Sequence, residues 1–107
     1  KKEKNNKFEN ILCFSPSFIL NQKIANYPNH IKIDTDGNEL DILKNMDQIL
    51  RSKKLKSLCI ENEFGKGENS RRRKIIKILE KKNFYLHSED ILNVGYNMFF
   101  YRIKKWF

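Results

Sequence analysis

The sequence predicts an α/β fold in which a mainly parallel sheet is flanked by helices. Short apolar runs, which are typical of strands, alternate with longer segments in which apolar residues recur at helical spacing. The expected order is helix, strand, helix, strand, helix, strand, strand, and such alternation favours parallel strands joined by helical crossovers. The last two strands follow each other closely, which predicts an antiparallel hairpin. At 107 residues the chain fits one small domain or part of a larger one.

The chain divides into a lead-in and one domain. Residues 1–13 hold a polar stretch and a short apolar segment, and residues 14–107 are expected to form the domain. Ser15 and Pro16 predict the first helix, with the serine as its cap and the proline at its first position. The expected buried face of this helix consists of three apolar residues, Phe18, Ile19 and Ile24.

Two strand–helix units follow. The first combines a strand at 30–34 with one helix over 38–50. The apolar stripe that predicts this helix consists of Leu40, Ile42, Leu43, Met46, Ile49 and Leu50. The second unit combines a strand at 55–61 with a helix over 71–82, capped by Ser70. The run Leu58-Cys59-Ile60 is continuously apolar, which favours a strand that is covered on both faces.

The predicted sheet ends with strands at 84–87 and 96–103. The last strand is rich in aromatic residues, and we expect Phe99, Phe100 and Tyr101 to belong to the core. They could stack on nucleic-acid bases only if the structure exposed them.

The chain is strongly basic, with a net charge of +9 and a pI of about 9.6. Basic proteins are candidates for polyanion binding, so one alternative function is a small α/β nucleic-acid-binding module. However, lysine, asparagine and isoleucine make up 43 of the 107 residues, so compositional drift explains the charge equally well. The lysines are scattered along the sequence, which disfavours nucleic acid as the partner. The run Arg71–Lys74 could hold a phosphate, or it could form a solvated helix face.

Other compositional features exclude several classes of protein. Cys13 and Cys59 lie in separate apolar runs and lack metal-ligand spacing, so we expect two reduced, buried thiols and no metal site. No apolar run approaches the roughly 20 residues of a membrane helix. A cytoplasmic location is therefore the default expectation.

The most informative stretch is Ile31 to Leu43, where an apolar strand runs into acids and a glycine. Ligands of open α/β sheets bind at the carboxyl ends of strands. We expect Asp34 to orient a nucleophilic hydroxyl or amine or to accept its proton, although a turn residue is the alternative. Asp36 and Glu39 also suit a capping box. Glu61, which ends the next strand, could line the same crevice or pair with a lysine at the sheet edge.

These residues resemble the carboxyl-terminal half of the FkbM-type methyltransferases, which are S-adenosylmethionine-dependent enzymes of the Rossmann-like class. The resemblance covers roughly residues 14 to 104. It rests on four ordered landmarks, which are Lys32-Ile33-Asp34-Thr35-Asp36-Gly37-Asn38-Glu39-Leu40, Cys59-Ile60-Glu61, Ile78-Leu79 with Asn83-Phe84, and Asn97-Met98-Phe99-Phe100.

The resemblance implies both a fold and a reaction. The chain would supply the last four of seven strands, with the final strand antiparallel between its neighbours. The implied reaction transfers a methyl group from S-adenosylmethionine to a hydroxyl or amine of a small-molecule, sugar-linked or lipid-linked acceptor. The implied catalytic residues are Asp34, Asp36, Glu39 and Glu61.

The chain departs from the family pattern in two places. Pro16-Ser17 stands where the family usually carries a Leu-Asp pair. The glycine-rich loop and the acid that hold the cofactor belong to the family's first strands, and Gly65-Lys66-Gly67 makes no nucleotide fingerprint. The resemblance therefore implies that this chain alone is inactive. A half-sheet would also expose the edge of its first strand, through which the chain could self-associate.

Overall fold

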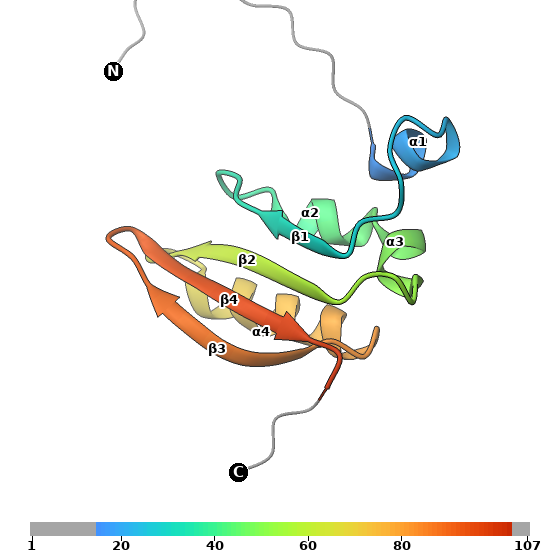
Figure 1. The fold of residues 1–107 in the computed structure, drawn as a ribbon. Coiled ribbons are helices and arrows are strands. Elements are labelled where there is room, and N and C mark those ends of the chain that lie inside the picture. Colours follow the sequence, from blue (N-terminus) through green and yellow to red (C-terminus); the bar gives the residue numbers. More distant parts are fainter. Residues whose placement is uncertain (1–14, 104–107) are drawn as a thin grey trace, which may run out of the picture.

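The computed structural model describes residues 15–103 as a four-stranded mixed sheet with flanking helices (Figure 1). The elements are α1 (Pro16–Asn21), β1 (His30–Ile33), α2 (Glu39–Lys44), α3 (Asp47–Arg51), β2 (Ser57–Glu63), α4 (Glu68–Glu80), β3 (Tyr85–Ile91) and β4 (Gly95–Tyr101). None of the helices in this part of the chain is long and apolar enough to cross a membrane.

The strands lie in the order β1-β2-β4-β3. β1 is parallel to β2, with Ile33 opposite Ile60. β4 is antiparallel to both of its neighbours, with Met98 opposite Ile60 on β2 and Glu89 on β3. The predictions of an α/β sheet with flanking helices and of an antiparallel final hairpin are therefore confirmed.

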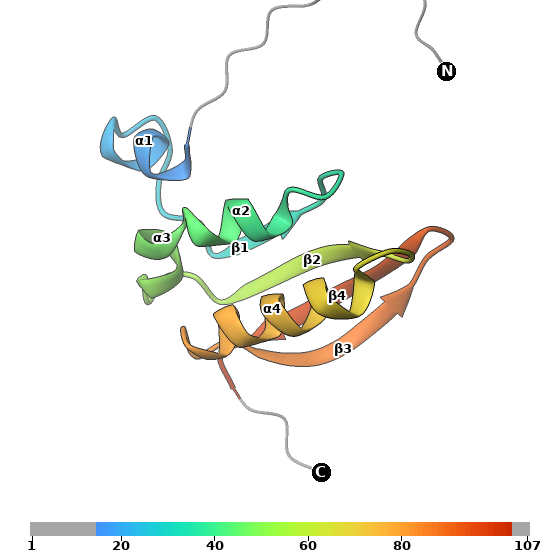
Figure 2. The ribbon, with the colours of Figure 1, turned by 180° about the vertical axis from the view of Figure 1, so that it is seen from behind.

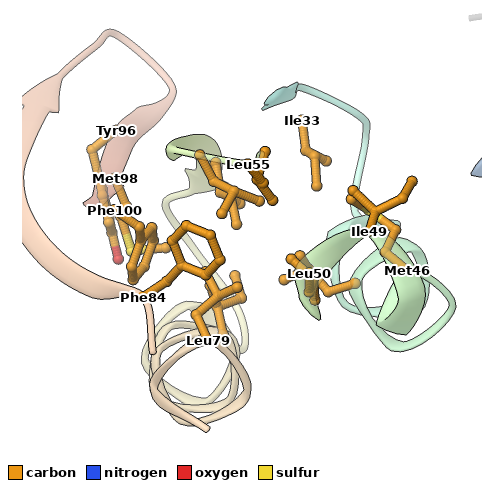
Figure 3. Close-up of a cluster of buried hydrophobic side chains, with 14 residues drawn as sticks. Ile33, Met46, Ile49, Leu50, Leu55, Leu79, Phe84, Tyr96, Met98 and Phe100 are labelled. Carbon is orange, nitrogen blue, oxygen red and sulfur yellow. The ribbon is translucent and has the colours of Figure 1, made fainter. Parts of the chain in front are cut away.

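The helices α2, α3 and α4 lie on one face of the sheet, while α1 lies beyond the β1 edge (Figure 2). The hydrophobic core fills the space between this face and the helices (Figure 3). Its buried apolar residues are Ile33, Leu43, Met46, Ile49, Leu50, Leu55, Leu58, Ile60, Ile75, Leu79, Phe84, Tyr96, Met98 and Phe100. No described helix crosses the opposite face of the sheet, which we call the open face.

The prediction that β2 is covered on both faces was wrong. Burial alternates along the strand, with Leu58 and Ile60 packed in the core and Cys59 only half-buried on the open face. The apolar run is continuous because Cys59, a small and weakly polar residue, occupies a half-buried position on the open face. It does not indicate a second layer of helices. Cys59 is therefore not the fully buried thiol that we expected, and Cys13 lies outside the described residues.

The helix predicted over 38–50 is broken into α2 and α3. The amide group of Asn45 donates a hydrogen bond to the Asp41 carbonyl oxygen at 2.7 Å, and the Asn45 backbone N–H bonds instead to Ile42 at 3.1 Å. Asparagine side chains compete with helix hydrogen bonds in this way. The apolar stripe still faces the core, because Leu43, Met46 and the two apolar residues of α3 are buried.

The first helix begins as predicted, with the Ser15 hydroxyl accepting a hydrogen bond from the Phe18 N–H at 3.1 Å. Its expected buried face was wrong, since Phe18 is 43% exposed and Ile24 is 62% exposed. α1 has only six residues, none of them buried, and it ends at Asn21. A helix this short beside a sheet edge has little surface against which to pack.

The aromatic residues of the last strand do not all join the core. Phe100 is fully buried, Phe99 is half-buried and Tyr101 is 41% exposed. Successive side chains of a strand point to opposite faces, so only alternate residues of β4 reach the helices. Several boundaries also differ from prediction. α4 is preceded by Gly67 in the left-handed region (φ 79°) rather than by Ser70, β2 runs on to Glu63 instead of ending at Glu61, and β3 continues to Ile91.

Candidate functional site

Two carboxyl groups meet beside the carboxyl end of β1, one directly after that strand and one within β2. Asp34 directly follows β1, and because Ile33 lies opposite Ile60, Asp34 lies beside Glu61. The Asp34 and Glu61 carboxyl groups lie within hydrogen-bonding reach of each other, and this contact raises the pKa of Glu61 above its ordinary value. Partial burial and the negative charges of Asp34 and Glu63 raise this pKa further, while Lys32 lowers it. The contact therefore favours the protonated form of Glu61.

The sequence left two roles open for Glu61, which are lining the crevice beside Asp34 and pairing with a lysine at the sheet edge. Lys32 is close enough to act on its pKa, but the hydrogen-bonding partner of Glu61 is Asp34. The ion pairs found among the described residues do not include Glu61. Glu61 therefore lies against Asp34 rather than in an ion pair with a lysine, and its role in a site stays a prediction.

Glu39 holds the loop that carries Asp34. Its side chain is almost fully buried, and its Oε2 atom accepts hydrogen bonds from the Thr35 N–H at 3.2 Å and the Thr35 hydroxyl at 2.8 Å. The helix cap is Asn38, without a side-chain hydrogen bond, so the predicted capping box of Asp36 and Glu39 was wrong. Because Glu39 is the first residue of α2, its carboxylate can reach back four residues to Thr35. Asp36 is exposed in the same loop.

The pairing of β4 with β2 and β3 extends this site across the sheet. Asn97 lies opposite Glu61 on one side and Asp90 on the other, so Asp34, Glu61, Asn97 and Asp90 form a row over all four strands. Side chains at directly opposite positions of antiparallel strands share a face and lie roughly 5 Å apart. The Asn97 Oδ1 atom is buried and accepts no hydrogen bond within the described residues. The sequence did not predict that Asp90 and Asn97 belong to the same row of polar side chains as Glu61. Only the strand order brings them together.

A buried polar network closes the loop between β2 and α4. The Asn62 amide, which is 1% exposed, donates to the Tyr96 hydroxyl at 2.9 Å and accepts from Arg71 Nε at 3.0 Å. Arg71 also donates to the carbonyl oxygens of Glu63 and Lys66 at 2.8 and 2.7 Å. Arg71 is therefore engaged by the protein itself, whereas Arg73 and Lys74 of the same run are exposed.

A groove of about 600 Å³ runs along the free side of β1. Its walls are mostly apolar side chains from α1, β1, α2 and α3, including Ile19, Ile31, Ile42, Met46 and Ile49. Asp34 and Thr35 also line it. The groove thus joins an apolar wall to the carboxylate of Asp34, an arrangement typical of small-molecule sites.

The described residues provide neither a metal centre nor a nucleotide loop. Within residues 15–103, no three His, Cys, Asp or Glu side chains are grouped so that they could hold a metal ion. Gly65 and Gly67 both have positive φ angles and belong to the loop that Arg71 closes. Comparisons of this chain with protein-family models, curated proteins and solved structures found no match.

Proposed function

We propose that this chain is the carboxyl-terminal half of a Rossmann-like methyltransferase domain of FkbM type, which methylates a hydroxyl or amine of a small, sugar-linked or lipid-linked acceptor. The observation that carries the proposal is the contact between Asp34, which directly follows β1, and Glu61, near the carboxyl end of the adjacent parallel strand β2. The antiparallel position of β4 between β2 and β3 supports it, because the resemblance implies that arrangement.

The residues described do not fit the adenosyl group of the cofactor. Gly95 is packed against β2, where an added Cβ atom would lie 2.2 Å from the Asn62 carbonyl oxygen, so it forms no cradle for a ligand. The two glycines of the Gly65–Gly67 loop are followed by a helix whose first turn is closed by Arg71 rather than open to a phosphate or ribose. The proposal therefore assigns the cofactor pocket to protein outside residues 15–103.

In the proposed reaction this chain positions the acceptor. The exposed carboxylate of Asp34 would accept a hydrogen bond from the acceptor hydroxyl or amine and so aim its lone pair. As the proton leaves the nucleophile, it would pass to Asp34, and the hydrogen-bonded Glu61 would share it. The apolar groove beside Asp34 would exclude water from the remainder of the acceptor. Glu39 would keep the Asp34 loop in place through Thr35.

The first test measures cofactor binding by calorimetry. We expect no S-adenosylmethionine binding by residues 1–107 alone, and micromolar binding by the product of the whole reading frame in which they occur. Micromolar binding by residues 1–107 would contradict the assignment of the pocket. Absence of binding by the whole product would overturn the proposed function.

The second test uses that whole product with radiolabelled methyl donor and a panel of sugar, lipid-linked and amine acceptors. We expect Asp34→Asn to lower kcat by about 100-fold or more, the usual scale for loss of a general base, with cofactor affinity unchanged. Asp36→Asn is the matched control, because it removes an exposed carboxylate from the same loop. Equal effects of the two substitutions would refute a specific role for Asp34.

A further inference from the structure

Four lysines converge on a hollow of about 230 Å³ between α2 and α4, on the helical side of the molecule. Lys74 and Lys77 lie on α4, and Lys81 directly follows it as the C-cap in a helical conformation. Their spacing of three and four residues places them on one side of the helix. Lys44, the last residue of α2, faces them across the hollow, and Ile78 completes the lining. The lysines that look scattered in the sequence are therefore gathered here by the packing of α2 against α4.

Among the described residues, the charged side chains that line the lysine hollow are all positive. All four lysines are exposed, and no carboxylate lines the hollow. Among the described residues, the ion pairs engage other basic side chains, namely Arg51, Arg72 and Lys82. Like charges at three- and four-residue spacing on a helix repel one another. An anion bound among the four ammonium groups would relieve that repulsion.

We propose that the lysine hollow binds the phosphodiester backbone of a nucleic acid. This inference goes beyond the proposed methyl transfer and does not depend on it. The hollow is smaller than the roughly 300–1,000 Å³ of small-molecule pockets, so it suits a phosphate group of a larger ligand. With a rise of about 1.5 Å per residue, the lysines of α4 extend over about 10 Å. A nucleic-acid strand presents several phosphates over that length.

The surroundings favour nucleic acid over a lipid surface. Binding at a membrane interface combines basic residues with apolar side chains that enter the lipid. The large apolar side chains that are exposed in the described residues include Phe64, Ile91 and Val94, and none of them lines the lysine hollow. Contacts made only by lysine ammonium groups to phosphates predict binding that is independent of sequence and steeply dependent on salt.

The test compares two triple variants of equal charge by fluorescence anisotropy, with a short labelled single-stranded DNA as the probe. Lys74→Gln, Lys77→Gln and Lys81→Gln remove the α4 stripe. Lys23→Gln, Lys53→Gln and Lys66→Gln remove three exposed lysines from other parts of the surface. Glutamine keeps a similar helix propensity, and circular dichroism checks that both variants are folded.

We expect the α4 variant to lose at least about 10-fold in affinity at about 50 mM salt, and its log–log salt dependence to become shallower by about 2. The dispersed variant should lose less than about 3-fold at the same salt. Equal losses in both variants, or no binding of the DNA at low salt, would overturn the proposal. So would displacement of the DNA by stoichiometric pyrophosphate, or binding of anionic vesicles in its place, since these outcomes identify a small-anion or lipid site.

Discussion

The carboxyl groups of Asp34, directly after β1, and Glu61, within the parallel neighbour β2, lie within hydrogen-bonding reach of each other. Neither side chain has a basic partner in an ion pair among the described residues. The neighbouring negative charge of Asp34 disfavours ionisation of Glu61, so the contact raises the pKa of Glu61. The proposed chemistry and the expected dependence of stability on pH both depend on this contact.

We expect the carboxyl pair to make the protein less stable as the pH rises. The pKa of Glu61 is raised in the folded state above its ordinary value of 4.5. A group whose pKa is raised by folding contributes stability that is complete below the unfolded pKa and is lost as the pH rises through the folded pKa. The Glu61→Gln variant, which keeps a hydrogen bond to Asp34 without the second charge, should lose this component.

Thermal unfolding of both proteins between about pH 4 and pH 8 measures this component, because that interval spans the ordinary carboxyl pKa and its raised value. Asp36→Asn, a change in an exposed loop carboxylate, serves as the control and should retain the wild-type pH profile. A Glu61→Gln profile that runs parallel to the wild type would show that the two carboxyl groups do not interact.

Arg102 should contribute strongly to stability, although no carboxylate in residues 15–103 forms an ion pair with it. Its guanidinium group donates to four backbone carbonyl oxygens, those of Leu50, Ser52, Leu55 and Lys82, at 2.6–3.1 Å. It also lies 4.0 Å from the centre of the Phe84 ring. Burial lowers the pKa of Arg102, but a guanidinium remains charged at neutral pH.

An Arg102→Lys variant keeps the charge but cannot reach four acceptors, so we expect a loss of about 2 kcal/mol in the free energy of unfolding. Arg51→Lys is the matched control. The Arg51 side chain is 70% exposed in its ion pair with Asp47, and such pairs contribute less than about 1 kcal/mol. Urea titration of both variants measures the difference. A loss for Arg102→Lys no larger than that of the control would disprove this role.

Gly95→Ala should destabilise the protein by steric conflict. Gly95 begins β4, and an added Cβ atom would lie 2.2 Å from the Asn62 carbonyl oxygen and 2.8 Å from the Glu63 Cα atom. Both atoms belong to the backbone of β2, so the two central strands would have to separate. We expect a cost of about 3 kcal/mol, at the upper end of overpacking effects.

The comparison for that substitution is Gly37→Ala. Gly37 has a φ angle of 94° and no atom within 4 Å of an added Cβ, so its cost comes from backbone conformation alone, about 1 kcal/mol. Guanidinium unfolding ranks the two variants. The reverse order would mean that the close contact between β2 and β4 relaxes without penalty.

The free side of β1 should allow residues 1–107 to self-associate. The Asn29 carbonyl oxygen accepts a hydrogen bond from the Ser57 N–H of β2, so by the alternation of parallel strands the N–H of Lys32 points to the free side. Unpaired strand edges recruit further strands. Sedimentation of the isolated chain should therefore show association that rises with concentration.

Lys32→Pro removes a donor on the free side of β1 without removing a hydrogen bond to β2, and proline is tolerated at sheet edges. We expect this variant to remain monomeric over the concentrations at which the wild type associates. A wild-type protein that is monomeric at every concentration would count against pairing through β1.

Local chemistry in the sequence determined where most elements begin and which residues enter the core. The Ser15-Pro16 cap, the strand around Ile33 and the buried positions Leu43, Ile75 and Leu79 all follow from spacing and residue type, because these features act over a few residues. The same reasoning placed Asp34 at the end of its strand, but it ended the next strand at Glu61, whereas β2 continues to Glu63. It did not foresee the break at Asn45, where one side-chain hydrogen bond outweighs helical periodicity.

Only the tertiary structure decided which residues from distant parts of the chain become neighbours. The insertion of β4 between β2 and β3 sets Asn97 and Asp90 next to Glu61, and the packing of α2 on α4 sets Lys44 against Lys74, Lys77 and Lys81. The helices on a single face leave Cys59 and Tyr101 partly exposed, where the apolar runs suggested burial. Such neighbours are far apart along the chain, and a sequence pattern carries no distance between them until the sheet order is known.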